Sequence, residues 1–166
     1  MSKNDDLLKA NQTYSEQFDK GDLKSPPQRN LAIVACMDAR LDIYRMLGLN
    51  EGEAHVIRNA GGVVTDDVIR SLAISQRLLG TEEIVLIHHT DCGMCTFRDD
   101  DIKDQIEQET GIRPPFSLEA FREPADDVRQ SARRIRASPF VARDDAMRGF
   151  VYDVKTGRLD EVDLDA

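Results

Sequence analysis

Two short, uninterrupted apolar runs constrain the fold of this chain more than any other feature of its sequence. They span residues 31–36 and 84–88, and neither alternates between apolar and polar residues. Continuous runs of this length are typical of strands buried on both faces, which occur in parallel sheets covered by helices. A third, shorter strand is expected at residues 54–57. The sequence therefore predicts an α/β fold with a mainly parallel β-sheet flanked by α-helices.

Helical patterns separate these strands. Thr65 is a typical helix-capping residue, and apolar residues at helical spacing lead from it to Gly80, a typical helix end. A second helix is expected from about Asp101 to Gly111. Strand–helix–strand units of this kind give parallel sheets with right-handed crossovers. Two further strands are expected at residues 149–154 and 159–162, joined by a turn.

The first part of the chain, residues 1–27, is expected to be an N-terminal helical arm. Leu7, Tyr14 and Phe18 recur at about helical spacing, and a proline pair ends the segment. A short amphipathic helix of this kind is expected to pack on something outside itself. Since 166 residues is the usual length of one compact domain, residues 1–166 are expected to form a single domain.

Composition excludes several classes of function. The 31 acidic and 22 basic side chains give a formal charge of −9, which repels the phosphate backbone of nucleic acids. No apolar run approaches the roughly 18 residues of a membrane-spanning helix, and the first ten residues lack the apolar core of a secretory signal. Three cysteines are too few, and of the wrong parity, for a disulfide scaffold. We therefore expect a cytoplasmic protein without nucleic-acid or membrane partners.

Chemically reactive side chains follow two of the apolar runs. Cys36 ends the first run, and His89 and Cys92 come directly after the other. The carboxyl ends of parallel strands meet at one edge of a sheet, where ligands bind. Taken alone, each cysteine is more often a small buried hydrophobe, and the histidine a hydrogen-bonded core residue. Together, two thiolates and one imidazole suit Zn²⁺ and leave its fourth tetrahedral position open.

Asp38 and Arg40 follow the first of these cysteines at a spacing of two residues each. An aspartate at that distance can reach the open position of a metal held by Cys36, and an arginine can hold the carboxylate in a bidentate fork. The alternative is a structural ion pair at the start of a helix. Beside a metal site, the pair is expected to act as a gate or as a support for the metal-binding residues.

Three motifs in this order resemble those of the β-class carbonic anhydrases, particularly the short bacterial and archaeal members. They are Cys36-x-Asp38-x-Arg40, Arg-Asn-Ala-Gly-Gly at residues 58–62, and His89-x-x-Cys92-Gly93. The resemblance implies Zn²⁺ bound by Cys36, His89 and Cys92, with Asp38 and Arg40 as the catalytic dyad. It implies reversible hydration of carbon dioxide to bicarbonate and a proton by a zinc-bound hydroxide. In a closed state known in the family, Asp38 would be a fourth ligand.

The same resemblance implies a homodimer, or a higher homo-oligomer built from dimers, in which the N-terminal helix lies across the neighbouring subunit. Two alternatives stay open. Hydrolysis of carbon disulfide or carbonyl sulfide uses the same scaffold and the same kind of site. A non-enzymatic thiol or zinc redox sensor would instead use Cys92 and Cys95, which form a Cys-x-x-Cys pair.

Overall fold

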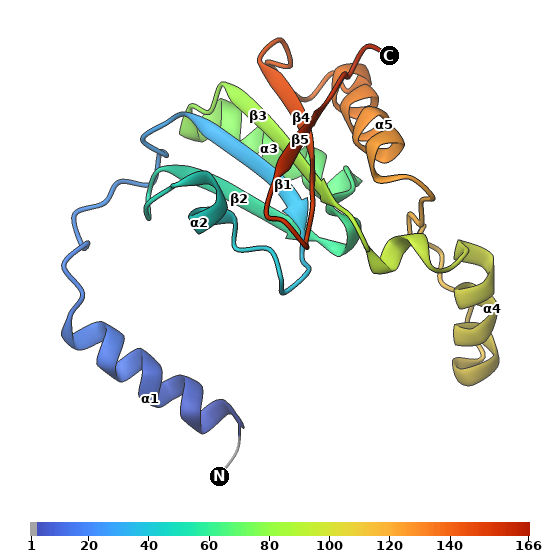
Figure 1. Cartoon of the computed structure of the whole chain (residues 1–166), viewed down its shortest axis with the longest axis horizontal. Helices are drawn as coiled ribbons and strands as arrows, with labels where there is room; N and C mark the ends of the chain where they lie inside the picture. The colour runs from blue at the N-terminus through green and yellow to red at the C-terminus, as the bar shows by residue number, and fades with distance from the viewer. Residues whose placement is uncertain (1–2) are drawn as a thin grey trace.

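The computed structural model describes residues 3–166, with a five-stranded sheet at its centre (Figure 1). The strands are β1 (Leu31–Cys36), β2 (Ala54–Asn59), β3 (Glu83–His89), β4 (Met147–Tyr152) and β5 (Leu159–Val162). Their order across the sheet is β2-β1-β3-β4-β5. Strands β1 to β4 are parallel, and β5 is antiparallel to β4. The mainly parallel α/β fold predicted from the apolar runs is confirmed.

Along the chain, one helix precedes the first strand and the other helices connect later strands. The helices are α1 (Lys3–Glu16), α2 (Ile43–Leu47), α3 (Asp66–Leu79), α4 (Asp99–Thr110) and α5 (Pro124–Ala137), with 3₁₀ turns at Ala60–Gly62 and Gly93–Cys95. Helix α3 begins and ends as predicted, because Thr65 Oγ1 accepts a hydrogen bond from Val68 N and Gly80 adopts a left-handed conformation. Helix α2 was not predicted, since its five residues are too few to show a periodic pattern.

Several strand boundaries differ from the predicted ones, for reasons that lie in pairing between strands. Strand β2 extends to Asn59 because that residue still pairs with Cys36. Strand β3 includes His89, which pairs with Tyr152, so this histidine ends the strand and does not follow it. Strand β4 stops at Tyr152 because the carboxylate of Asp153 accepts a hydrogen bond from Lys155 N and begins a turn.

Both faces of the sheet are buried, which explains the uninterrupted apolar runs. Residues of β1 that point to one face, such as Val34, pack with apolar residues of α3 and α5. Alternate residues, such as Ile33, pack on the other face with Leu41 and with Ile43 of α2. The carboxyl ends of β1, β2 and β3 emerge between these two apolar layers.

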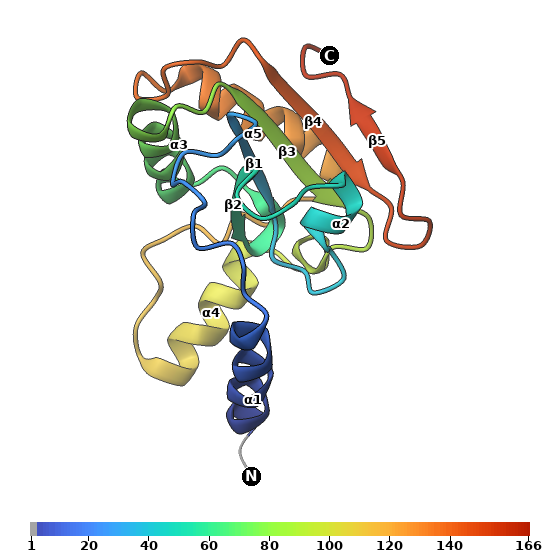
Figure 2. The same ribbon diagram turned by 90° about the vertical axis from the view of Figure 1, so that its left-hand side faces the viewer.

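Helix α1 stands away from the sheet, and Figures 1 and 2 show that α4 also projects from the body of the fold. Leu7 and Leu8 of α1 are 67% and 65% exposed. The arm is tied to the body at Glu51, whose carboxylate accepts a hydrogen bond from Tyr14 Oη and forms an ion pair with Lys20. Among residues 3–166, no helix has the length and apolar character needed to cross a membrane.

Candidate metal centre

Three buried side chains converge at the carboxyl edge of the sheet. Cys36 Sγ, a ring nitrogen of His89 and Cys92 Sγ all lie within 4.8 Å of one another. Cys36 ends β1, His89 ends the neighbouring strand β3, and Cys92 lies in the loop that follows β3. The parallel pairing of β1 with β3 brings the two strand ends together, as the sequence predicted.

The glycine pair of the second motif, Gly61 and Gly62, packs directly against this site. Gly61 and Gly62 have φ values of +82° and +73°, which side-chain-bearing residues rarely adopt. A Cβ atom on Gly62 would lie 2.7 Å from the backbone nitrogen of Cys36. Only glycine therefore allows the loop after β2 to approach the end of β1 this closely.

The imidazole of His89 is oriented as a metal ligand would be. Its Nδ1 lies 2.8 Å from the carbonyl oxygen of Thr90, which assigns the ring proton to Nδ1. Its Nε2 is then left with a lone pair, is buried, and has no hydrogen-bond partner among the described residues. A buried nitrogen without a partner is costly, and a metal ion would satisfy it.

The two cysteines of the cluster favour one negative charge before any metal binds. A hydrogen bond from the Cys92 thiol lowers the pKa of Cys36 to about 4, despite the opposing effect of burial. The pKa of Cys92 is raised, because its thiol donates to Cys36 and a second buried thiolate would be repelled. A dication with a preference for sulfur and imidazole ligands, such as Zn²⁺, fits this donor set.

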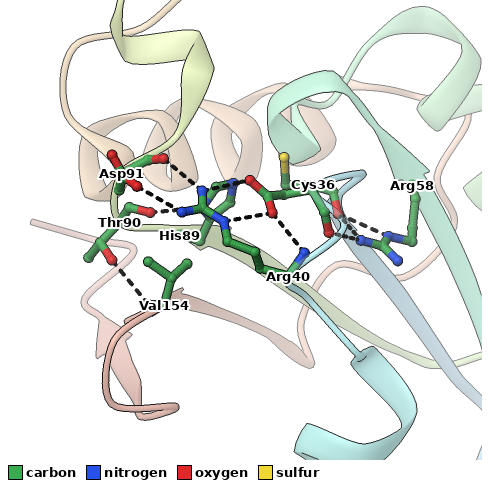
Figure 3. A network of polar contacts seen from close by, with 8 residues as sticks. Cys36, Arg40, Arg58, His89, Thr90, Asp91 and Val154 are labelled. Carbon is green, nitrogen blue, oxygen red and sulfur yellow. Dashed lines mark hydrogen bonds and ion pairs between the residues drawn. The ribbon is translucent and has the colours of Figure 1, made fainter.

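Asp38 and Arg40 lie beside the cluster, and Figure 3 shows Arg40 next to His89. Arg40 Nε and Nη2 donate to the two carboxylate oxygens of Asp38 at 2.9 and 2.7 Å, which is the bidentate fork expected from the spacing. This guanidinium holds the pKa of Asp38 well below its usual range. Asp38 Oδ2 lies 3.7 Å from His89 Nε2. An ionised carboxylate therefore borders the cluster, while both its oxygens are bonded to Arg40.

Arg40 also joins the two loops that carry the site. Its Nη1 donates to Asp91 Oδ2 at 2.7 Å, and its Nη2 donates to the carbonyl oxygen of Asp91 at 2.9 Å (Figure 3). Asp91 has a φ of +54°, a conformation that aspartate tolerates better than most residues. Sequence reasoning did not assign a role to Asp91, although its position between His89 and Cys92 was a signal.

The remaining histidines and cysteine lie outside the cluster. His88 points to the opposite side of β3, where its Nε2 lies 2.7 Å from Asp127 Oδ2 of α5. His55 Nδ1 lies 2.7 Å from Ser75 Oγ. Cys95 is partly buried, and burial raises the pKa of its thiol. The third cysteine is therefore separate from the group formed by Cys36, His89 and Cys92.

The fold and the site together define an α/β protein with a candidate Cys–His–Cys metal site at the carboxyl edge of a parallel sheet. A model of the carbonic anhydrase family matches residues 31–159. Beta-carbonic anhydrase 1 of Mycobacterium tuberculosis is 65% identical over 162 residues, which cover 98% of this chain and 99% of the relative. The chain belongs to the β-carbonic anhydrase family, a family of lyases.

Solved structures and more distant relatives agree with this assignment. A carbonic anhydrase from Streptococcus mutans superposes with a TM-score of 0.92 at 43% identity, covering 98% of this chain and 99% of that one. A carbon disulfide hydrolase from an Acidianus species is 33% identical, covering 93% of this chain and 86% of the relative. The family resemblance inferred from the three motifs is confirmed over nearly the whole chain.

Proposed function

We propose that this chain catalyses the reversible hydration of carbon dioxide to bicarbonate and a proton, with Zn²⁺ held by Cys36, His89 and Cys92. The observation that carries the proposal is the buried, unpartnered Nε2 of His89, which faces two cysteine sulfurs within 4.8 Å. Zinc at this position would act as a Lewis acid that makes water nucleophilic near neutral pH. A stopped-flow assay of carbon dioxide hydration, on protein of known zinc content, tests the proposal.

Asp38 is proposed to accept a hydrogen bond from the attacking water and so to orient its lone pair toward carbon dioxide. The position of its carboxylate, 3.7 Å from His89 Nε2, supports this role. Arg40 is proposed to keep that carboxylate ionised and in place, since it donates to both oxygens. A closed state, with Asp38 as a fourth metal ligand, would require this fork to break and stays a prediction.

The variant Asp38→Asn tests the dyad. The amide has nearly the same shape, but its nitrogen cannot accept a hydrogen bond from water or from Arg40. We expect kcat/KM for carbon dioxide hydration to fall by roughly 100-fold or more, the usual range for a lost proton-handling group. Zinc content should be unchanged, because Asp38 is outside the cluster of three ligands. Steady-state kinetics and metal analysis on the same preparation measure both.

A matched control is Asp67→Asn. Asp67 also pairs with an arginine, Arg70, but the pair is exposed on helix α3. This control should retain the parent activity. Full hydration activity in zinc-loaded Asp38→Asn would show that the dyad is not catalytic.

Carbon dioxide is preferred over carbon disulfide as the substrate on the strength of similarity. The relatives named carbon disulfide hydrolases share about half as much identity with this chain as the β-carbonic anhydrase of M. tuberculosis does, 33% against 65%. Both substrates are linear and electrophilic at carbon. Parallel assays of the zinc-loaded protein with each substrate separate the two activities.

We also propose that the protein is a homodimer, or is built from dimers, and that the N-terminal arm lies on the neighbouring subunit. The exposed leucine pair of α1, on a helix that stands away from its own sheet, supports this arrangement. A cytoplasmic location is part of the same proposal, because reducing conditions keep the thiols of Cys36 and Cys92 available to a metal.

The double variant Leu7→Ser, Leu8→Ser tests the role of the arm. Burying both leucines against a second subunit would contribute about 1.5–3 kcal/mol per side chain. We therefore expect the dimer dissociation constant to rise by at least about 100-fold, as measured by analytical ultracentrifugation across a dilution series. The variant Gln12→Ser, on the same helix, should leave the dissociation constant unchanged. Equal dimer stability in the parent and the double variant would contradict the proposed arrangement.

A further inference from the structure

We propose that Arg58 is a positioning residue that holds the turn between Cys36 and Asp38 in the geometry required by the metal centre. This inference rests on the proposed function and deepens it, because it assigns a role to a residue that lies in neither the ligand set nor the dyad. Arg58 belongs to β2, the edge strand of the sheet, and reaches across to the end of β1 (Figure 3).

Within residues 3–166, every hydrogen bond of the Arg58 side chain goes to a backbone oxygen of this turn. Nε and Nη2 donate to the carbonyl oxygen of Cys36 at 2.9 and 2.8 Å. Nη2 also donates to the carbonyl oxygen of Asp38 at 2.7 Å. Hydrogen bonds from a charged donor are the stronger kind, and a planar guanidinium can join two acceptors in a fixed arrangement.

The turn depends on this side chain because the strand ladder ends at Cys36. Asn59, the last residue of β2, pairs with Cys36, and its carbonyl oxygen accepts a hydrogen bond from Met37 N at 2.8 Å. Beyond that bond, the turn has no further strand partner among residues 3–166, although the carbonyl oxygen of Asp38 also accepts a hydrogen bond from Leu41 N at 3.1 Å. The guanidinium of Arg58 donates hydrogen bonds to the carbonyl groups of Cys36 and Asp38, and so orients the backbone on both sides of Met37.

Orienting those carbonyl groups also orients the donors of the same turn. The backbone N–H of Arg40 donates to Asp38 Oδ1 at 2.9 Å. A turn freed from Arg58 would misplace the Cys36 sulfur and the Asp38 carboxylate together. Arg58 thus acts through the backbone and touches neither the metal ligand atoms nor the proposed substrate.

The variants Arg58→Ala and Arg58→Lys separate geometry from charge. Alanine removes every contact, whereas lysine keeps the positive charge but lacks the rigid fork that joins the two carbonyl groups. We expect zinc affinity to fall by about 10–100-fold in both, the usual effect of losing a group that orients a metal ligand. In the zinc-loaded variants kcat should fall, with KM for carbon dioxide within about twofold of the parent, since Arg58 does not contact the substrate.

The matched control is Arg77→Ala. Arg77 also donates to a backbone carbonyl oxygen, that of Phe140. It lies near the end of α3 that leads into the start of β3, and the candidate metal site lies at the other end of that strand. Zinc affinity is measured by competition with a chromogenic chelator, and thermal unfolding confirms that each variant is folded. If Arg58→Ala does not fold, Arg58→Lys carries the comparison.

Two readouts are independent of activity. Cobalt(II) substituted for zinc reports on the cysteine sulfurs through its charge-transfer absorption, which should shift in both Arg58 variants and not in Arg77→Ala. Added guanidinium should partly restore zinc affinity and the absorption band in Arg58→Ala. Parent-like zinc affinity and cobalt spectra in both folded Arg58 variants would overturn the proposal. These measurements decide the role of Arg58 even if the parent protein fails to hydrate carbon dioxide, so the two failures are distinguishable.

Discussion

Replacing Cys36 by serine is expected to leave the protein without bound zinc and with no carbon dioxide hydration above the rate in buffer. The substitution removes the thiolate that the structure favours most, because a hydrogen bond from the Cys92 thiol lowers the pKa of Cys36 to about 4. A neutral hydroxyl is a poor replacement for that charge, and only two of three protein ligands remain. Metal analysis and stopped-flow kinetics on the purified variant measure the two losses.

Cys95→Ser is the matched control, since this cysteine lies outside the cluster. It should retain zinc and the parent rate. The redox-sensor alternative predicts the reverse pattern, because it requires Cys92 and Cys95 and makes Cys36 dispensable. Zinc retained in Cys36→Ser but lost in Cys95→Ser would therefore refute the assigned ligand set.

Gly62→Ala is expected to destabilise the fold strongly. The new Cβ would lie 2.7 Å from the nitrogen of Cys36 and 2.9 Å from the carbonyl carbon of Ala35, and backbone atoms cannot move aside cheaply. Overpacking of this kind costs about 1–3 kcal/mol, and a φ of +73° costs alanine roughly 1–2 kcal/mol more. We expect a decrease of roughly 4–20 °C in Tm, measured by calorimetry of the metal-free protein.

Gly80→Ala separates the two contributions. Gly80 has nearly the same φ, +74°, but a Cβ there meets no atom within 4 Å. This control should lose only the smaller amount that comes from backbone strain. Equal decreases in Tm for the two variants would contradict the close approach of Gly62 to the end of β1.

The centre of the fold was predictable because its signals are local. The apolar runs at residues 31–36 and 84–88 indicated strands buried on both faces, and the capping residues of α3 fixed its ends. Helix α2 escaped prediction because its signals are weak. It has five residues, with Asp42 as its N-cap and Gly48 as its C-cap.

The candidate site was predictable where residues follow a strand directly. Cys36 and His89 end neighbouring parallel strands, so their sequence positions were enough to bring them together. The contacts of Arg40 with Asp91, and of Arg58 with the carbonyl groups of the turn, join segments far apart in the chain. Such contacts depend on side-chain direction and on the register of β2 against β1, which no local pattern encodes.

The central claim is that a zinc centre in this chain hydrates carbon dioxide. The most direct measurement is stopped-flow hydration by protein of measured zinc content, before chelation, after chelation and after zinc is returned. We predict a rate proportional to bound zinc, which is lost on chelation and recovered when zinc is added back. A rate no faster than buffer, in protein that carries about one zinc ion per chain, would contradict the claim.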